Sequence, residues 1–258
     1  MITLTTDFGE GLYSAQVKGR ILSINPDARV VDITHSITKF DILEGAFLVN
    51  EVSKYFPRGT IHIAVVDPGV GGRRSPIVVE TERGFFIGPD NGIFTFLQPK
   101  RIFEISLQRL YDALGERKDV SSTFHARDIF GPAAALLSKG VGLGNIGKER
   151  PTMEKIEIEP PSFSDGKYQG RVLYIDSFGN IITNMKYEFP KGRISVSVGK
   201  KVANAEVCST FSDVPEGNVA VLKGSHGFIE IDVHKGNASN ELKAKKWDKI
   251  IIHQRNDK

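Results

Sequence analysis

The sequence predicts an N-terminal α/β domain, with a mainly parallel sheet flanked by helices, followed by a small all-β, barrel-like C-terminal domain. Strand-like runs alternate with helical periodicity in the first part of the chain, a β-α-β-α-β order typical of parallel sheets covered by helices. After about residue 150 the pattern changes to short strands separated by Pro- and Gly-containing breaks. We therefore predict domains at 1–150 and 169–258, joined by a linker at 151–168 that is rich in Pro, Glu, Lys and Ser.

Composition narrows the class of protein. The chain has 258 residues, 40% hydrophobic and 25% charged, which is ordinary for a globular protein with a real core. A net charge of +3 is too small to require a nucleic-acid partner. Its single cysteine, Cys208, excludes an intrachain disulfide framework and a cysteine-based metal site. No apolar run approaches the roughly 20 residues of a membrane span, and the chain starts directly with a strand, so we expect a cytoplasmic protein.

The elements of the first domain follow from periodicity. A strand at residues 2–6 precedes a helix whose apolar residues fall four and three apart, and a second strand follows at 29–33. Asp41 is a plausible N-cap for the next helix, which leads to a buried strand at 60–66. Two short strands flank residues 81–84, and 93–97 is expected to open a helix or a short strand. A helix rich in small residues is predicted at 129–138.

The loop from Asp67 to Arg74 is the centre of this pattern. Pro68 cannot donate to a sheet ladder, and the glycines at 69, 71 and 72 permit tight turns. The loop therefore carries a carboxylate and a guanidinium away from a buried strand, at the sheet edge where α/β proteins bind ligands. Taken alone, this arrangement is equally compatible with a surface turn containing an ordinary Asp–Arg pair.

The C-terminal part shows six short strands, at 171–176, 180–184, 193–198, 201–207, 218–223 and 227–233. The basic tail at 243–247 is interpreted as a solvated end of the fold. Other motifs are ambiguous by themselves. Asp7-Phe8-Gly9 matches the metal-binding triplet of protein kinases, but no nucleotide-binding lobe precedes it, so a kinase is excluded. Asp7 therefore either binds ribose hydroxyls or serves as a turn residue. His125, just before a helix, is expected to stay neutral near the positive helix end.

Six motifs in register resemble the S-adenosyl-L-methionine hydroxide adenosyltransferase family, which is related to the bacterial fluorinase and chlorinase. The resemblance extends from residue 2 to about residue 240. The motifs are Thr6-Asp7-Phe8-Gly9, Val66-Asp67-Pro68-Gly69-Val70-Gly71, Gly88-Pro89-Asp90-Asn91-Gly92, Thr123-Phe124-His125-Ala126-Arg127-Asp128, Asp176-Ser177-Phe178-Gly179-Asn180 and Gly236-Asn237-Ala238.

This resemblance implies a reaction and a set of residues. The reaction is S-adenosylmethionine plus water giving adenosine and L-methionine, in homotrimers whose sites lie between the α/β domain of one subunit and the β domain of its neighbour. The implied water-activating residues are Asp67, Arg74 and His125. The implied substrate contacts are Asp7 at the ribose, Phe40 at the pocket wall, Asp176 and Ser225 at the methionine end, Asn180 and Ala238 at adenine, and Phe178.

The chemistry fits these residue types. The sulfonium leaves as a neutral thioether and needs no acid, but bulk water, with a pKa near 15.7, supplies little hydroxide at neutral pH. Arg74 favours hydroxide, and either His125 or Asp67 could take the proton. No metal or cofactor is required. The halogenating relatives lack the Asp–Arg–His set, so its presence favours water as the nucleophile. One departure is Gly11-Leu12, where many relatives have an acidic residue that contacts the methionine end.

Three alternatives remain open at this stage. The first is a non-catalytic sensor that binds S-adenosylmethionine or adenosine in the same pocket. The second is halide-dependent adenosyl transfer. The third is an RNA-binding protein, which would need aromatic residues interleaved with Lys and Arg on one sheet face, and the sequence shows no such stripe.

Overall fold

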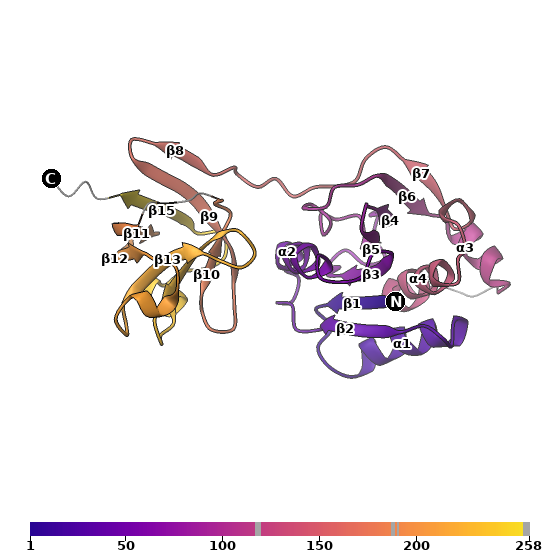
Figure 1. Ribbon diagram of the computed structural model, residues 1–258. Helices are drawn as coiled ribbons and strands as arrows, with labels where there is room; N and C mark the ends of the chain where they lie inside the picture. Colours follow the sequence, from indigo (N-terminus) through magenta and orange to yellow (C-terminus); the bar gives the residue numbers. More distant parts are fainter. Residues whose placement is uncertain (117–119, 187–188, 190, 255–258) are drawn as a thin grey trace. The chain divides into compact units, whose positions relative to one another are not determined.

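The protein divides into two compact units, Met1–Ile156 and Glu157–Lys258 (Figure 1). The structure is a computed structural model that describes residues 1–116, 120–186, 189 and 191–254. The last four residues of the predicted second domain lie outside this range. Within the described residues, every helix is too short or too polar to traverse a lipid bilayer.

The first unit contains a seven-stranded sheet in the order β2-β1-β3-β5-β4-β6-β7. The first four strands in this order are mutually parallel, and β4, β6 and β7 run antiparallel to their neighbours. The strands are β1 Ile2–Thr6, β2 Val30–Thr34, β3 Thr60–Val65, β4 Pro76–Glu80, β5 Gly84–Pro89, β6 Arg101–Ile105 and β7 Gly147–Arg150. The predicted α/β class is confirmed, with the parallel half of the sheet formed by the elements that the sequence pattern identified.

Helices cover both faces of this sheet because β3 is apolar on both sides. Ile61, Ile63 and Val65 pack on the face covered by α1, α3 and α4, whereas Ala64 and Val66 pack with residues of α2. Such a strand is typical of parallel sheets. The helical elements of the unit are α1 Leu12–Ile24, α2 Ile42–Ser53, α3 Leu107–Leu114, the π-helical turn η1 Ala126–Phe130, α4 Gly131–Ser138 and the 3₁₀ turn η2 Leu143–Asn145.

Local signals explain several of these boundaries. Asp41 caps α2 as predicted, since its carboxylate accepts a hydrogen bond from the Glu44 amide at 2.9 Å. The run 93–97 forms successive turns and is neither the helix nor the strand that we expected. Asn91 explains this difference, because its side chain accepts from the Ile93 amide and donates to the Val66 carbonyl. That pattern is an Asx turn, which competes with regular structure.

The second unit is the predicted all-β, barrel-like domain. Its eight-stranded sheet has the order β10-β14-β13-β12-β11-β15-β9-β8, and an additional β9–β10 pairing closes the ring and leaves β8 outside it. Alternate residues of the strands fill the barrel core, including Val196, Val221 and Ile231. The elements are β8 Ser162–Ser164, β9 Lys167–Ile175, β10 Ile181–Thr183, β11 Gly192–Val198, β12 Lys201–Val207, η3 Phe211–Asp213, β13 Val219–Lys223, β14 Ile229–Val233, α5 Ala238–Leu242 and β15 Lys249–Gln254.

One expectation about this unit was wrong, and another holds only in part. The basic tail does not end the fold, because it leads into β15, where Ile250 and Ile252 are fully buried and the strand pairs with both β11 and β9. The linker expected at 151–168 is irregular from 151 to 161, but its last residues form β8 and the start of β9, joined through Asp165 and Gly166, both with positive φ. Asp-Gly at a two-residue turn is a strong hairpin signal, and the charged composition around it concealed it.

Candidate active site

The first unit contains a pocket of about 590 Å³ near the carboxyl ends of β1 and β3. Four residues expected from the resemblance line it: Asp7, Phe40, Asp67 and His125. The position agrees with the general rule for α/β sheets, in which ligands bind beyond the carboxyl ends of the strands.

Arg74 joins the two other members of the expected triad. Its Nε donates to Asp67 Oδ1 at 3.1 Å, and its Nη2 donates to Asp67 Oδ2. The same Nη2 contacts His125 Nδ1 at 2.7 Å. The side chains of Asp67 and Arg74 are only 5% and 10% exposed, and the guanidinium lies over the Phe130 ring at 5.5 Å. A forked, charge-assisted contact of this kind fixes orientation as well as charge.

The contact with Arg74 defines the state of His125. A guanidinium can only donate hydrogen bonds, so Nδ1 accepts, and the proton of the neutral ring is on Nε2. Burial and then the Arg74 charge lower the pKa of His125 below its ordinary value of 6.5, against the opposing effect of Asp67 and Asp128. The imidazole is therefore neutral at neutral pH, with one N–H to donate and no lone pair left uncommitted.

Gly71 brings the two halves of this site together. It has a positive φ of 75°, and a Cβ placed there would lie 2.2 Å from the Ser122 carbonyl oxygen. A glycine is required because the loop after β3 approaches the backbone of the segment that carries His125. Asn91 supports the same loop by donating to the Val66 carbonyl at 2.9 Å. These contacts place Asp67 and His125 on one pocket wall.

Asp7 and Phe40 form a second wall. The Asp7 carboxylate accepts the Phe40 amide at 3.0 Å, and Phe40 has a φ of 68° with 68% of its surface exposed. A non-glycine residue in this region costs on the order of 1–3 kcal/mol, and such strain clusters at functional sites. The Asp7 contact therefore holds an exposed aromatic ring at the rim of the pocket.

The expected residues of the second unit gather around the turn between β9 and β10. Asp176 Oδ1 accepts the Phe178 and Asn180 amides, both at 2.9 Å, and its Oδ2 accepts Asn180 Nδ2 at 3.0 Å. Phe178 is 75% exposed. The start of α5 meets this turn, since the Ser239 amide donates to the Gly179 carbonyl at 2.9 Å. Asp176, Asn180 and Ala238 are thus brought into one region of this unit.

Two residues of this set have distinct environments. Ala238 is completely buried, backbone and methyl group alike. Ser225 lies exposed on the turn between β13 and β14, closed by the Gly227 amide donating to the Gly224 carbonyl at 2.8 Å.

Several pocket residues were missed by sequence reasoning. Tyr13 and Gln16, three residues apart on α1, line the pocket together with Lys39, Phe124 and Arg127. The spacing of Tyr13, Gln16 and the buried Val17 was a usable signal for a helix facing both the core and a site. Arg127 was seen only as part of a helix-start motif. Among the described residues, no group of three or more His, Cys, Asp or Glu side chains is placed to hold a metal ion.

Comparison with known proteins identifies the family. Residues 2–147 match the family model described as SAM hydroxide adenosyltransferase N-terminal domain, and residues 170–251 match that of the C-terminal domain. A protein of Methanocaldococcus jannaschii named (R)-S-adenosyl-L-methionine hydrolase is 38% identical, over 98% of this chain and 95% of its own length.

Two further relatives define the range of similarity. The solved structure of an uncharacterized conserved protein from Thermotoga maritima superimposes with a TM-score of 0.91 at 35% identity, covering 98% of this chain and all of that one. A fluorinase of an Actinoplanes species is more distant, at 24% identity over 84% of this chain and 85% of its own. Both domain models match in order and the hydrolases align over nearly the full length, so the chain belongs to the SAM hydroxide adenosyltransferase family.

Proposed function

We propose that the protein hydrolyses S-adenosyl-L-methionine to adenosine and L-methionine. The observation that carries this proposal is the contact of one guanidinium, Arg74, with both Asp67 and His125 at the pocket wall. The hydrolase names of the relatives that are 31–38% identical support the same reaction. These names specify the (R) form of the sulfonium centre, and we extend this preference to the present chain.

In the proposed reaction, a water oxygen attacks the ribose C5′ from the side opposite the sulfonium. The C5′–O bond forms while the C5′–S bond breaks, and the bonding pair stays on sulfur as the neutral thioether of methionine. One proton of the water must be removed. Since the uncharged leaving group needs no acid, we propose that the reaction requires neither a metal nor a cofactor, and that activity persists in the presence of a chelator.

We infer that Asp67 takes this proton. His125 is a poor candidate, because its Nδ1 accepts from Arg74 and its Nε2 carries the ring proton. A carboxylate that accepts two bonds from Arg74 still has free lone pairs on both oxygens. In this assignment, Arg74 stabilises the developing hydroxide and the His125 Nε2–H donates to it. Water that is held in line also gains from fixed orientation.

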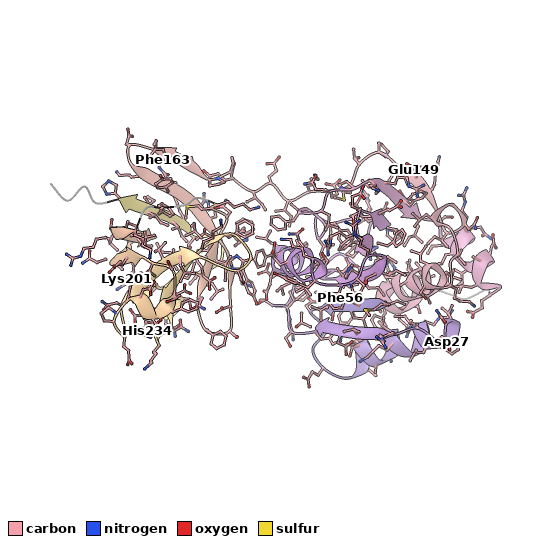
Figure 2. The ribbon with its side chains drawn as sticks, viewed as in Figure 1. Asp27, Phe56, Glu149, Phe163, Lys201 and His234 are labelled. Atoms are coloured by element: carbon pink, nitrogen blue, oxygen red, sulfur yellow. The ribbon has the colours of Figure 1, made fainter. Side chains whose placement is uncertain are left out.

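Asp67→Asn is the direct test, because the substitution keeps the shape of the side chain and removes the base. We expect kcat for adenosine formation to fall roughly 10²- to 10⁴-fold, the usual contribution of a positioned base. The matched control is Asp27→Asn, an exposed aspartate that does not line the pocket (Figure 2). Separated (R) and (S) epimers, assayed by chromatography with and without added halide, define the substrate and the nucleophile.

Each alternative has its own signature in this experiment. Tight binding of both epimers without turnover by the parent protein would contradict hydrolysis and favour a sensor. A 5′-halogenated nucleoside as the main product would favour halide transfer. Unchanged kcat in Asp67→Asn, with the parent active, would leave hydrolysis standing and remove Asp67 as the base.

We also propose the homotrimer with shared sites that the family resemblance implies. Exposed aromatic rings on both units support it, since Phe40 is 68% and Phe178 75% exposed, and an assembly would bury such surface. If a site draws on two subunits, Asp67→Asn and Asn180→Ala chains should recover activity when they are co-assembled. A monomeric mass with full activity would contradict this arrangement. A cytoplasmic location remains our prediction.

A further inference from the structure

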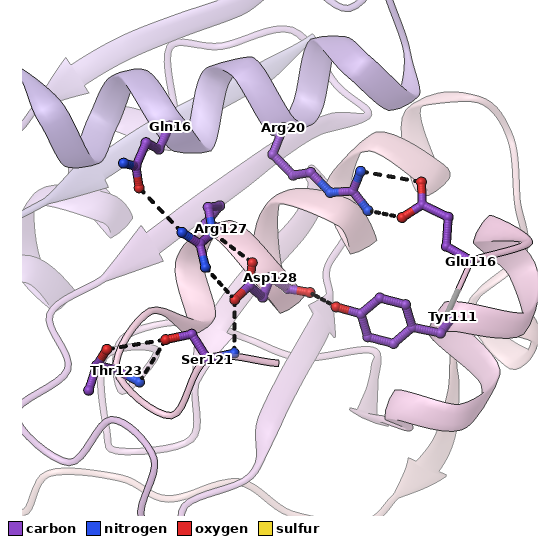
Figure 3. A network of polar contacts seen from close by, with 8 residues as sticks. All are labelled: Gln16, Arg20, Tyr111, Glu116, Ser121, Thr123, Arg127 and Asp128. Carbon is purple, nitrogen blue, oxygen red and sulfur yellow. Dashed lines mark hydrogen bonds and ion pairs between the residues drawn. The ribbon is translucent and has the colours of Figure 1, made fainter. Parts of the chain in front are cut away.

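His125 lies in a segment with unusual local structure, and this segment supports an inference that rests on the proposed function. The π-helical turn η1 begins directly after His125, and α4 follows it (Figure 3 shows the surrounding polar network). Single π-turns are rare and occur frequently at functional sites. Contacts from outside the helix hold this turn in place.

Pro132 explains why the helix cannot be regular here. In an α-helix the Asp128 carbonyl would accept the amide of residue 132, but proline has no N–H. The Tyr111 hydroxyl donates to this carbonyl instead, at 2.9 Å, from helix α3 (Figure 3). The Gly131 amide reaches back five residues to the Ala126 carbonyl, which is the π-type bond. The turn therefore depends on a side chain from another helix.

The Asp128 carboxylate closes the same segment from its other side. Its side chain is fully buried, and its oxygens accept Arg127 Nε at 2.7 Å and Nη2 at 2.8 Å. Oδ2 also accepts the Ser121 amide at 3.0 Å. Because Ser121 precedes His125 and Asp128 follows it, one carboxylate ties together the two ends of the loop that carries the histidine (Figure 3).

We propose that Asp128, assisted by Tyr111, is a positioning residue that holds His125 Nδ1 at 2.7 Å from Arg74. Asp128 does not line the pocket, so it acts on the reaction through residues that do, His125 by way of the loop and Arg127 by direct contact. The geometric consequence is specific. Opening the Ser121–Asp128 closure lets the histidine loop move away from the loop after β3, and a displacement of about 1 Å in a catalytic group costs on the order of 10²-fold in rate.

A simpler role for Asp128 predicts the opposite spectroscopic result. The Asp128 charge raises the pKa of His125, whereas burial and Arg74 lower it. If Asp128 acted by charge alone, removing the charge would lower the pKa of His125 further. If Asp128 positions the loop, its loss separates His125 from Arg74, and the pKa of His125 rises toward 6.5.

The experiment uses Asp128→Asn and Tyr111→Phe in the 258-residue chain, with Asp112→Asn, an exposed aspartate on α3, as the matched control. The pKa of His125 is measured by NMR of the imidazole nitrogens, with the resonance assigned from a His125→Asn variant. We expect this pKa to rise in both variants and kcat to fall tenfold to a hundredfold, with no change in the control. Since Asp128 also holds Arg127, which lines the pocket, only Tyr111→Phe is expected to leave KM within about twofold.

The outcomes separate this proposal from the proposed function. A lowered or unchanged pKa of His125 in a folded Tyr111→Phe variant overturns the positioning role, whatever the rate. If the parent protein does not hydrolyse S-adenosylmethionine, the proposed function fails, and the NMR titration still decides whether Asp128 and Tyr111 position His125. If Asp128→Asn does not fold, judged by circular dichroism, the decision rests on Tyr111→Phe, which removes a single hydrogen bond.

Discussion

Two aspartates, one in each unit, are buried to the same degree, but one is paired with a cation and the other is not. Asp128 and Asp232 are each 1% exposed. The Asp128 carboxylate meets the Arg127 guanidinium at 2.7 Å and the Ser121 amide at 3.0 Å. The Asp232 carboxylate is buried with no cation among the described residues to pair with it, and its charged neighbours, Glu230 and Asp176, are both acidic. Burial and then the charge of Glu230 raise the pKa of Asp232 to about 9.

The difference teaches how a buried carboxylate is accommodated. Next to the pocket, Asp128 stays ionised because it is paired with Arg127, and this pair orders the loop that carries His125. In the barrel wall, no cation of the described part of the chain compensates the charge, so the proton stays on Asp232 at neutral pH. Isolated buried charges are too costly to persist, and they either pair or neutralise. Only the first arrangement gives rigid geometry and a local field, which are what the proposed chemistry needs.

The largest expected effect comes from making Asp128 resemble Asp232. Arg127→Leu removes the guanidinium from a fully buried carboxylate, and losing one partner of a buried pair typically costs about 3–5 kcal/mol. Because the Arg127 side chain is 31% exposed, we expect the lower end of this range. Amide hydrogen exchange of β1 and β3 measures the unfolding free energy of this unit.

The control for this comparison is Arg58→Leu, at an exposed arginine in the same unit, which should change stability by no more than about 0.5 kcal/mol. Equal effects of the two substitutions would mean that the Arg127–Asp128 pair has no special weight. The comparison of the two aspartates would then rest on Asp232 alone.

Some of these features are set by residues close together in the sequence, and others by contacts between distant segments. The strand ending at Asp67, the cap at Asp41 and the barrel strands were predictable, because hydrophobic period and turn residues act over a few positions. The π-turn was not. A helix was predicted from Ile129, yet its geometry depends on Tyr111, distant in sequence, replacing the hydrogen bond that Pro132 removes.

The site shows the same division. The residues Asp67, Arg74 and His125 were named from a family resemblance, and no local pattern indicates that Arg74 Nη2 lies 2.7 Å from His125 Nδ1. This contact depends on Gly71, where the loop after β3 meets the Ser122 backbone. Strand β15 was missed because its pairing partners, β9 and β11, are distant in the chain, although the run Ile250-Ile251-Ile252 was a usable signal.

An intermediate effect on stability is expected in the first unit at acidic pH, and it comes from His62. His62 is 4% exposed, contacts Thr3 Oγ1 at 2.8 Å and stacks on Phe86, and burial lowers its pKa from 6.5 to about 4. Between these values the unfolded chain binds the proton and the folded one does not, so stability falls as pH decreases from 6.5 to 4. At about 1.4 kcal/mol per pH unit, the total loss is roughly 3 kcal/mol.

His62→Phe should reduce this acid dependence in the first unit, measured by hydrogen exchange of β3 amides at several pH values, and leave the smaller part that the lowered pKa of His125 contributes. His253→Phe, at an exposed histidine of the other unit, should leave it in place. An undiminished acid slope in His62→Phe would show that groups other than His62 destabilise this unit at low pH.

The smallest change in stability over its pH range, and the sharpest test of the comparison, is expected from Asp232→Asn. The folded state holds the Asp232 proton up to about pH 9, whereas an unfolded aspartate releases it near 3.8, so stability decreases as pH rises between these values. From pH 7 to 9 the expected loss is roughly 2–3 kcal/mol in the parent protein. The asparagine side chain of the variant has no proton to release, so this slope should disappear, while activity stays at the parental level. Fluorescence of Trp247, the single tryptophan, reports unfolding of this unit, and the exposed Asp165→Asn is the control that keeps the slope. An unchanged alkaline slope in Asp232→Asn would mean that Asp232 is ionised in its buried position, and the contrast with Asp128 would be one of packing and not of charge.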